Sequence, residues 1–337
     1  MPATVIVDAL WGDSGKGKAC AYLSRRIDAD LAVRAGVGTN AGASVTVGDG
    51  ELIKARQLPT GWLNPGTRVA VGSGVLVDPK VFAGELDRYD LADRALVDRR
   101  CPVITELHIA EEKADQHLVK RVGSTCTGNG HARADSVLRR AQQARDVPEL
   151  APYLADVAEE ANRIAAEPEG QVIIESSQGT MLSLGFSDDY PYTTSGNCTT
   201  AAALDAVGLN WRHLTEVIMV VKALPTRVGE GPLPYEISAE EAQRRGIVEY
   251  GVNTGRTRRK ADRLDYGLLR YAAMLNGPTQ IALTFCDHLD PQLRGATTPA
   301  AITDQVRRVI DDVEQATDAP VTLLDTGPHL EHVIALR

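Results

Sequence analysis

The chain has 337 residues, of which 43% are apolar and 24% are charged, and its formal net charge is −9. This length and composition exclude a fibrous protein and a miniature scaffold, and they are typical of an acidic globular protein with a large core. Proteins that bind nucleic acid through its phosphates usually have a basic surplus, so we expect no nucleic-acid partner. No apolar run approaches the roughly 18 residues of a membrane span and no leader pattern is visible, so we expect a cytoplasmic protein without membrane contact.

Five cysteines are scattered along the chain without CxxC spacing. They are Cys20, Cys101, Cys126, Cys198 and Cys286. This odd and irregular set indicates neither a disulfide framework nor a structural zinc site. We expect ordinary thiols in or near the core.

Short β-branched runs alternate with amphipathic segments along the chain. The runs predicted as buried parallel strands are Ala3–Val7, Leu31–Arg34, Arg68–Val71, Gln171–Glu175, Glu216–Val221, Gln280–Thr284 and Val321–Leu324. The segments predicted as helices are Ala19–Ile27, Val147–Ala166, Ala239–Arg245, Asp265–Leu275 and Pro299–Ala316. No repeat or long linker divides the chain. The pattern predicts an α/β fold in which a single large domain, residues 1–337, has a mostly parallel central sheet flanked by helices.

The first predicted strand leads into a loop, Gly12-Asp13-Ser14-Gly15-Lys16-Gly17-Lys18, that matches GxxxxGK. Such a loop surrounds phosphates with backbone N–H groups and an ammonium at the start of a helix. Ala19 stands where a Ser or Thr commonly holds Mg²⁺, but Asp13 offers a carboxylate to a cation or a proton. An ordinary turn is the alternative, and the position between a strand and a helix favours phosphate binding.

Other polar segments also follow predicted strands. Residues 36–44 form either a second small-residue binding loop or an ordinary turn. Residues 123–130 offer hydroxyls, and Arg139 and Arg140 follow on a predicted helix, which suits a phosphomonoester or a plain polar loop. Residues 256–260 hold four cations in five positions, which suits a solvated face or a clamp for a carboxylate or phosphate. Asp287 could either cap a helix or accept hydrogen bonds from the N1–H and 2-amino group of a guanine.

Together these segments resemble the adenylosuccinate synthetase family. WGDSGKGK is similar to the family's WGDEGKGK, NAGAS to NAGHT, GSTCTGNG to GTTGRGIG, and SSQGTMLSL to GAQGTLLDI. TRVGEGPLP, NTGRTRR, TFCD and DTGP are similar to TRVGAGPFP, TTGRRRR, TKLD and STGP, and the matches run in order from residue 4 to residue 328. The resemblance implies a two-step carbon–nitrogen ligase of purine biosynthesis with a P-loop-type phosphate-binding loop. An NTP γ-phosphoryl group passes to O6 of a 6-oxopurine nucleoside monophosphate, and the amine of L-aspartate then displaces phosphate from C6.

The resemblance also implies roles for single residues. The expected catalytic residues are Asp13, Lys16 and Gln178, with Asp13 taking the N1 proton, and Mg²⁺ is expected on Asp13 and the Gly42 carbonyl. The expected phosphate-donor (ATP or GTP) residues are Ser14, Gly15, Lys16, Gly17, Lys18, Phe285, Asp287 and Gly327. The expected purine-nucleotide residues are Asp13, Ser14, Asn40, Ser124, Thr125, Arg139, Gln178, Thr194, Val228 and Gly229, with Arg139 reaching across a homodimer. Thr254, Arg256 and Arg258 are expected to bind aspartate.

Three positions depart from the family pattern. Ala43 stands where the family has a catalytic His, Ser14 where it has Glu, and Phe285 where a Lys lies against the donor guanine. Ser14 leaves room near the N1/C2 edge of the purine, and an aromatic ring stacks on any base. These departures resemble a bacteriophage branch that joins aspartate to dGMP with ATP as donor, on the way to 2-aminoadenine DNA, and the location is then the host cytoplasm. The sequence therefore predicts a dGMP- and ATP-using ligase, with two alternatives: a conventional synthetase that uses IMP and GTP, and a non-catalytic purine-nucleotide sensor.

Overall fold

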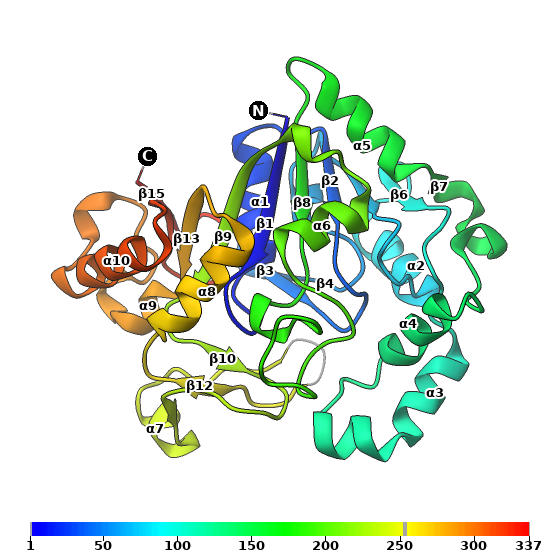
Figure 1. Cartoon of the computed structure of the whole chain (residues 1–337). Coiled ribbons are helices and arrows are strands. Elements are labelled where there is room, and N and C mark those ends of the chain that lie inside the picture. Colours follow the sequence, from blue (N-terminus) through cyan, green and yellow to red (C-terminus); the bar gives the residue numbers. More distant parts are fainter. Residues whose placement is uncertain (1, 252–254, 337) are drawn as a thin grey trace.

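A ten-stranded sheet runs through the computed structural model, which describes residues 2–251 and 255–336 (Figure 1). The strand order is β15-β14-β13-β9-β1-β8-β2-β5-β6-β7. Neighbouring strands are parallel, except that β15 runs antiparallel to β14. The prediction of an α/β fold with a mostly parallel central sheet is confirmed, whereas the domain bounds 1–337 stay a prediction.

The predicted strands all lie in this sheet. Its members are β1 (Ala3–Asp8), β2 (Leu31–Arg34), β5 (Arg68–Val71), β6 (Ala95–Asp98), β7 (Leu154–Ala155), β8 (Val172–Glu175), β9 (Leu214–Lys222), β13 (Gln280–Thr284), β14 (Val321–Asp325) and β15 (Val333–Ala335). The α-helices in the described residues are α1 (Lys16–Arg26), α2 (Pro79–Tyr89), α3 (Glu106–Ala114), α4 (Asn129–Val137), α5 (Val157–Ala166), α6 (Thr200–Val207), α7 (Ala239–Arg244), α8 (Tyr266–Asn276), α9 (Cys286–Leu289) and α10 (Asp304–Thr317).

Helices cover both faces of the sheet. Every residue of the central strand β1 is buried, and its side chains alternate between two cores. Val5 and Val7 pack on the side of α5, α6, α8 and α10, whereas Ile6 packs on the side of α1 and α2. Because neither face of the sheet is exposed to water, the strands are continuous runs of apolar residues. This pattern is the reason why they could be predicted from the sequence.

One predicted helix, Val147–Ala166, is wrong in its first half. Residues Pro148–Tyr153 form a 3-10 helix, Leu154–Ala155 joins the sheet as β7, and only then does α5 begin. Pro152 lies inside that 3-10 segment, and proline lacks the N–H that an α-helix requires. The side chain of Asp156 accepts a hydrogen bond from the Glu159 N–H at 3.1 Å and thereby starts α5.

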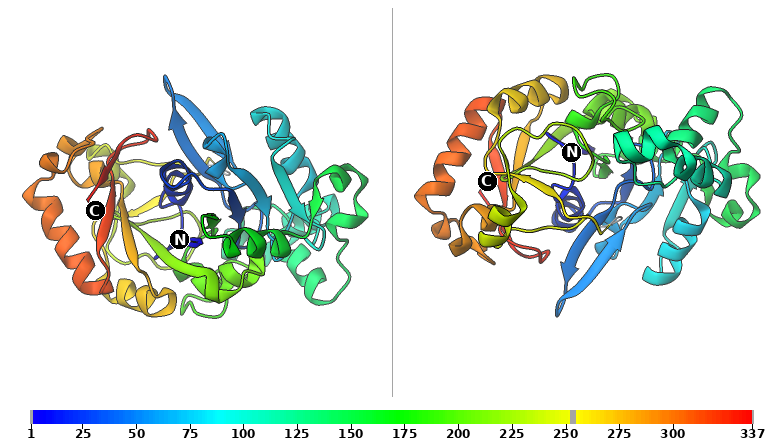
Figure 2. Two further views of the ribbon diagram at one scale, coloured as in Figure 1. Left: turned by 90° about the horizontal axis from the view of Figure 1, so that it is seen from above. Right: turned by 90° about the horizontal axis from the view of Figure 1, so that it is seen from below.

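Two smaller sheets lie beside the central one. The hairpin of β3 (Ala43–Val47) and β4 (Glu51–Ala55) projects from the body of the molecule (Figure 2). The second sheet has the order β10 (Thr226–Arg227), β12 (Arg259–Ala261), β11 (Glu236–Ile237). In Figure 1 this second sheet and the α3–α4 pair lie below the central sheet, at the end where β1 and β8 finish. The loops between them form the candidate site.

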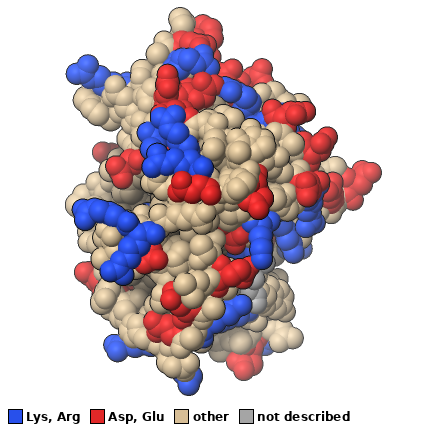
Figure 3. Space-filling model, turned by 90° about the vertical axis from the view of Figure 1, so that its right-hand side faces the viewer, with Lys and Arg blue, Asp and Glu red and all other residues tan. Residues whose placement is uncertain are grey.

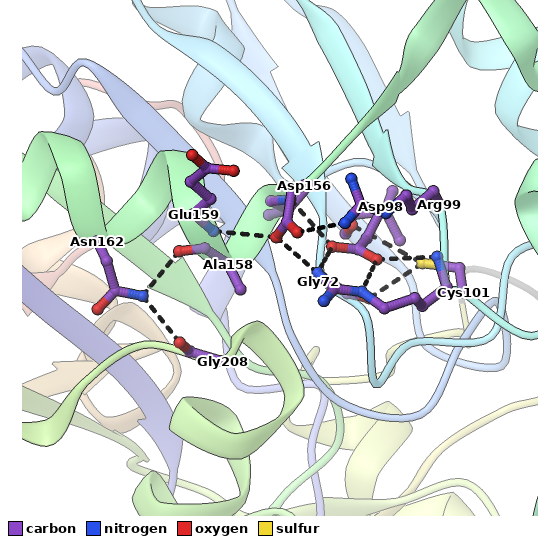
Figure 4. A network of polar contacts seen from close by, with 12 residues as sticks. Gly72, Asp98, Arg99, Cys101, Asp156, Ala158, Glu159, Asn162 and Gly208 are labelled. Atoms are coloured by element: carbon purple, nitrogen blue, oxygen red, sulfur yellow. Dashed lines mark hydrogen bonds and ion pairs between the residues drawn. The ribbon is translucent and has the colours of Figure 1, made fainter.

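Figure 3 shows the face that carries α2 to α5, where Lys and Arg side chains are interspersed with Asp and Glu. Buried beside this face is a network around Asp98, at the end of β6 (Figure 4). Asp98 accepts hydrogen bonds from the Arg100 guanidinium at 2.7 and 2.8 Å and from the Val157 N–H at 3.0 Å. It thereby ties the edge of the sheet to the first turn of α5.

Candidate active site

The loop after β1 turns sharply before α1 begins at Lys16. Gly12, Asp13 and Gly15 all have positive φ angles, of 81°, 51° and 91°. No side chain caps the N-terminus of α1, so the first N–H groups of the helix are available to an anion. A Cβ atom on Gly17 would lie 2.5 Å from the Cβ of Ala43, so only glycine fits there. The local geometry is that of a phosphate-binding loop.

The two lysines of this loop have different surroundings. Lys16 is buried, lies 3.3 Å from the Asp8 carboxylate, and donates a hydrogen bond to the Gln178 carbonyl. The Lys18 ammonium instead donates to Asp325 at 2.6 Å, to the Gly327 carbonyl at 2.6 Å and to the His332 carbonyl at 2.9 Å. All three Lys18 protons are thus used behind the loop, where they tie it to the region around β14.

A cleft opens above this loop and gathers most of the predicted site residues. The predicted residues that line it are Asp13, Ser14, Gly15, Lys16, Gly17, Asn40, Gly42, Ser124, Thr125, Gln178, Thr194, Val228, Gly229, Arg258 and Phe285. Most of them come from loops at the carboxyl ends of β1, β2, β8, β9 and β13, whereas Ser124 and Thr125 lie between α3 and α4 and Arg258 directly precedes β12. Open parallel sheets bind their ligands at this edge.

Hydrogen bonds hold the loops on the far side of the cleft. The Asn40 amide donates to Thr194 Oγ1 at 3.1 Å. The Thr125 and Thr127 hydroxyls lie 3.0 Å apart, and the Ser124 hydroxyl donates to Glu112. Hydroxyls and small residues therefore face the cleft from the segments predicted to hold a nucleotide.

Arg258 joins the predicted aspartate segment to the phosphate-binding loop. Its Nε atom lies 2.9 Å from the Asp13 carboxylate, and its Nη1 donates to Glu249 at 2.8 Å. Arg256 is exposed and donates to the Gly123 carbonyl at 3.3 Å, at the rim of the cleft. Thr254, the third residue predicted to bind aspartate, lies outside the described residues.

Glu249 was not predicted, yet it is the centre of a buried charge cluster. It accepts hydrogen bonds from Lys222 at 2.6 Å, from Arg258 and from Lys260. Burial lowers the pKa of Lys222 to about 8 even though Glu249 acts in the opposite direction. Burial raises the pKa of Glu249, but the surrounding cations, Lys222 first, hold it well below its usual value. The ion cluster therefore stays charged behind the cleft.

A second unpredicted pair, Arg34 and Glu175, lies in the wall of the cleft. The two residues end the neighbouring parallel strands β2 and β8, face each other in register and form a buried ion pair. Glu175 also accepts from the Thr60 N–H at 2.9 Å, and the Thr60 hydroxyl donates to the Gly17 carbonyl at 2.6 Å. A charged residue at the end of an otherwise apolar strand was the signal in the sequence for both.

Among the described residues, five predicted ones lie outside the cleft lining: Lys18, Arg256, Asp287, Gly327 and Arg139. Asp287 is buried next to Asp325, and Gly327 accepts from Lys18, so both lie close to the loop near Phe285. Arg139 is exposed and has a φ of 61°. The prediction that Arg139 and Arg140 lie on a helix is wrong, because α4 ends at Val137 and the turn is closed by the Arg140 N–H, which donates to the Asp135 carbonyl.

The three departures from the family pattern all lie at the loop. Ser14 is 2% exposed, and its hydroxyl has no hydrogen-bond partner within the described part of the chain. Ala43 begins β3 and contacts Gly17. Phe285 has a φ of 58°, and its ring centroid lies 4.1 Å from the Lys222 ammonium. A positive φ is unusual for a bulky side chain.

Residues 2–251 and 255–336 include no group of three or more His, Cys, Asp and Glu side chains that could hold a metal ion. A cation at the loop could bind the Asp13 carboxylate, and Gly42 also belongs to the cleft lining.

No helix in the described residues is long and apolar enough to cross a membrane.

Comparisons with known proteins agree with this geometry. A family model described as "Adenylosuccinate synthetase" matches residues 5–149 and 141–294. Proteins named adenylosuccinate synthetase from Thermococcus onnurineus and Archaeoglobus fulgidus are each 44% identical to this chain, over 100% of it and 99% of their own lengths.

Two solved structures share the fold. Fully ligated adenylosuccinate synthetase from Plasmodium falciparum matches with a TM-score of 0.90 and 21% identity, and 100% of both chains is covered. Succinoaminodeoxyadenylate synthetase of cyanophage S-2L, bound to dGMP and to dATP as an energy donor, matches with a TM-score of 0.82 and 25% identity. That match covers 99% of this chain and 95% of the phage chain.

Proposed function

This chain belongs to the adenylosuccinate synthetase family of carbon–nitrogen ligases, and we propose that it joins L-aspartate to C6 of dGMP with ATP as the phosphate donor. The product of this reaction is 2-amino-2′-deoxyadenylosuccinate, a precursor of 2-aminoadenine DNA. Family membership gives the reaction class and its place in purine biosynthesis. The choice of dGMP and ATP rests on residues of the cleft.

Ser14 is the observation that carries the choice of a guanine acceptor. Its hydroxyl is buried at the cleft and lacks a partner among the described residues, so an incoming amino group can satisfy it. The Glu that the family has here is longer and acidic, and it fills space that the 2-amino group needs. The phage synthetase that resembles this fold was solved with dGMP, which supports the same choice.

Phe285 supports the choice of an adenine donor. An aromatic ring stacks on any base, whereas the family's Lys lies against guanine. The ring approaches Gly15 of the loop, since a Cβ on Gly15 would lie 3.8 Å from Phe285 Cε2. The donor base is therefore expected next to the donor phosphates, between Phe285 and the region of Asp287 and Gly327.

In the proposed first step, Asp13 takes the N1 proton while O6 attacks the γ-phosphorus and the bond to ADP breaks. In the second step the aspartate amine attacks C6, and phosphate leaves with the electron pair of the C6–O6 bond and takes up the proton that the amine loses. Lys16 and the amides of α1 neutralise charge on the transferred group, so catalysis is mainly positioning and electrostatics. Gln178 places the purine beside Lys16, to which its carbonyl is already bonded.

Ala43 removes a general acid that is worth about 10² to 10⁴ in rate. Lys16 is the lysine of the loop that lines the same cleft as Ala43. We assign to it the stabilisation of charge that develops at O6.

Mg²⁺ is the proposed cofactor, and the donor set fits it. Magnesium usually takes one or two carboxylates together with substrate phosphates and water, and Asp13 is a carboxylate of that kind. When bound, the ion neutralises the donor phosphates. Asp13 holds it from the protein side, together with the Gly42 carbonyl.

Two further proposed contacts come from the predicted aspartate segment and from Arg139. Arg256, Arg258 and Thr254 are proposed to bind the carboxylates of aspartate, because guanidinium groups bind carboxylates through paired hydrogen bonds. Arg139 is exposed in the turn that follows α4, so its proposed nucleotide is one bound by a second subunit of a homodimer.

The second candidate is a conventional synthetase that uses IMP and GTP. It is favoured by the archaeal relatives, which are 44% identical and carry that family's general name. In that case Ser14 and Phe285 have no effect on specificity. A non-catalytic nucleotide sensor is the third, and Asp13, Lys16 and Arg258, brought together at the cleft, argue against it.

A phosphate-release assay with L-aspartate and Mg²⁺ tests these candidates. Acceptors dGMP, GMP and IMP are crossed with donors ATP, dATP and GTP, and product masses are read by mass spectrometry. Turnover of dGMP with ATP supports the proposal. Turnover only of IMP with GTP replaces it with the conventional synthetase, and nucleotide binding without any turnover replaces it with the sensor.

A further inference from the structure

Lys222, the last residue of β9, has no role among the residues that the family resemblance names. Its side chain is only 2% exposed. Its ammonium donates to the Asp13 carbonyl at 3.0 Å, to Thr226 Oγ1 at 2.8 Å and to Glu249 at 2.6 Å. The same ammonium lies 4.1 Å from the centroid of the Phe285 ring. One buried cation therefore contacts three separate parts of the site.

The first contact bears on the proposed base. Asp13 has a φ of 51°, a left-handed conformation that costs free energy in a residue other than glycine. Lys222 binds the Asp13 carbonyl, and the Thr284 hydroxyl binds the next carbonyl, of Ser14, at 2.7 Å. These two hydrogen bonds hold the loop in the conformation that presents the Asp13 carboxylate to the cleft.

The second contact bears on the proposed aspartate site. Glu249 binds both Lys222 and Arg258, and Arg258 in turn lies 2.9 Å from the Asp13 carboxylate. Lys222 therefore binds the backbone of Asp13, and Arg258 lies against its side chain. Glu249 binds both cations and so links the two contacts.

The third contact bears on the donor base. Phe285 also has a positive φ, and a cation over an aromatic ring face is attracted to it. The position of the ring next to Gly15 is thus fixed by the same ammonium that fixes Asp13.

We propose that Lys222 is a positioning residue that sets the Asp13 loop, the Arg258 side chain and the Phe285 ring in one relative arrangement. It touches no substrate and does not act as an acid or a base. Its removal leaves the acceptor contacts in place and misaligns the groups that transfer the phosphoryl group. This proposal rests on the ligase reaction of the family and does not depend on whether dGMP or IMP is the acceptor.

Lys260 supplies a matched control. It is also buried and also binds Glu249, and it contacts His288 Nδ1 at 3.2 Å. No hydrogen bond or ion pair described for it reaches Asp13 or Phe285. Lys222→Met and Lys260→Met both remove one cation from Glu249, but only the first removes the hydrogen bond to the Asp13 carbonyl.

The test separates the first step from the whole reaction in the full-length protein. Without aspartate, ¹⁸O exchange between the bridging and non-bridging positions of the donor reports phosphoryl transfer to the acceptor that the wild type uses. For Lys222→Met we expect this rate to fall about 100-fold, the size of effect that a misplaced reacting group produces. The dissociation constant of the acceptor nucleotide, measured by equilibrium dialysis, is expected to change less than about threefold, because its contacts are unaffected. Lys260→Met is expected to keep the exchange rate within about threefold of the wild type.

Equal losses of exchange in Lys222→Met and Lys260→Met would show that only the cluster charge matters, and this overturns the proposal. An unchanged exchange rate in Lys222→Met overturns it as well. If Lys222→Met does not fold, Lys222→Arg decides, since it keeps the charge opposite Glu249 but its longer planar head cannot reproduce the contacts to Asp13 and Phe285 together. For Lys222→Arg we expect the exchange rate to fall at least tenfold while the melting temperature stays that of the wild type. An exchange rate equal to that of the wild type overturns the proposal. A wild type that turns over no acceptor refutes the proposed function itself, which distinguishes the two failures.

Discussion

The Nε atom of Arg258 lies 2.9 Å from the Asp13 carboxylate, so the proposed base and a proposed ligand of aspartate form an ion pair across the cleft. The Arg258 side chain is 8% exposed and the Asp13 side chain 24% exposed, so the pair is sheltered at the edge of the cleft. Substrate aspartate offers Arg258 a second carboxylate in the same place.

The first prediction concerns Arg258→Ala. A charge-assisted hydrogen bond to a carboxylate contributes about 1.5 to 3 kcal/mol, so the KM for aspartate should rise about 10- to 100-fold. The KM values for both nucleotides should change less than about threefold. Arg259→Ala is the control for the aspartate site, because Arg259 binds Glu236 and the Gly231 carbonyl and reaches the cleft lining only through the Gly229 carbonyl at 3.4 Å. Steady-state kinetics with aspartate as the varied substrate measure this change. An unchanged KM for aspartate would mean that Arg258 does not bind aspartate.

The second prediction concerns Ser14→Glu. The longer carboxylate should occupy the space proposed for the 2-amino group and lower kcat/KM for dGMP relative to IMP about 10- to 100-fold. Ser14→Ala serves as the matched variant, since it removes the hydroxyl without filling the space, and dGMP should then lose less than about tenfold. Both ratios come from competition of the two acceptors in one assay. An unaltered ratio in Ser14→Glu would falsify the account of the 2-amino group.

Much of the fold could be predicted because the buried strands are short apolar runs separated by Gly-rich loops. The strands β1, β2, β5 and β13 were predicted within one residue at each end. The error at Val147–Ala166 arose because amphipathic spacing continues through Pro148 and Pro152, where an α-helix cannot form. The hairpin β3–β4 was missed because its exposed residues, such as Glu51 and Leu52, weaken the strand pattern.

The site was less predictable than the fold. Residues of contiguous motifs, such as Asp13 and Lys16, were found because motif and loop coincide. Glu249 and Lys222 were not found, because their meaning lies in contacts between segments that are far apart in the sequence. Lys18 matched the family motif, yet its ammonium is bound by Asp325 behind the loop. Which way a side chain points from a tight loop depends on tertiary partners that no local pattern contains.

The third prediction concerns Phe285→Lys. Restoring the family's residue removes the aromatic surface and places a second ammonium next to Lys222, which lies 4.1 Å from the present ring. The ratio of kcat/KM for GTP over ATP should rise about tenfold, because stacking on any base is lost. Asp287→Asn tests the same pocket from the other side: it should lower GTP use and leave ATP use within about threefold. Donor competition measures both, and an unchanged ratio in Phe285→Lys assigns donor choice to other residues.

The fourth prediction concerns stability at a distance from the cleft. Asp98 is fully buried and holds the Arg100 guanidinium and the Val157 N–H (Figure 4). Asp98→Ala leaves the buried Val157 N–H without its partner and the Arg100 guanidinium with Asp156 alone, and it should lower the free energy of unfolding by about 3 kcal/mol. Arg99→Ala is the control: its pair with Asp156 is half exposed, and such surface pairs contribute less than about 1 kcal/mol.

Urea unfolding followed by circular dichroism measures both differences. The kcat/KM of the folded fraction should stay within about twofold of the wild type in each variant, since neither Asp98 nor Arg99 lines the cleft. Equal stability losses for Asp98→Ala and Arg99→Ala would mean that Asp98 does not anchor α5 to the sheet. A loss of kcat/KM in fully folded Asp98→Ala would instead mean that the edge of the sheet at β6 and β7 affects the phosphate-binding loop. We do not expect this, because the hydrogen bonds around Asp98 do not reach that loop.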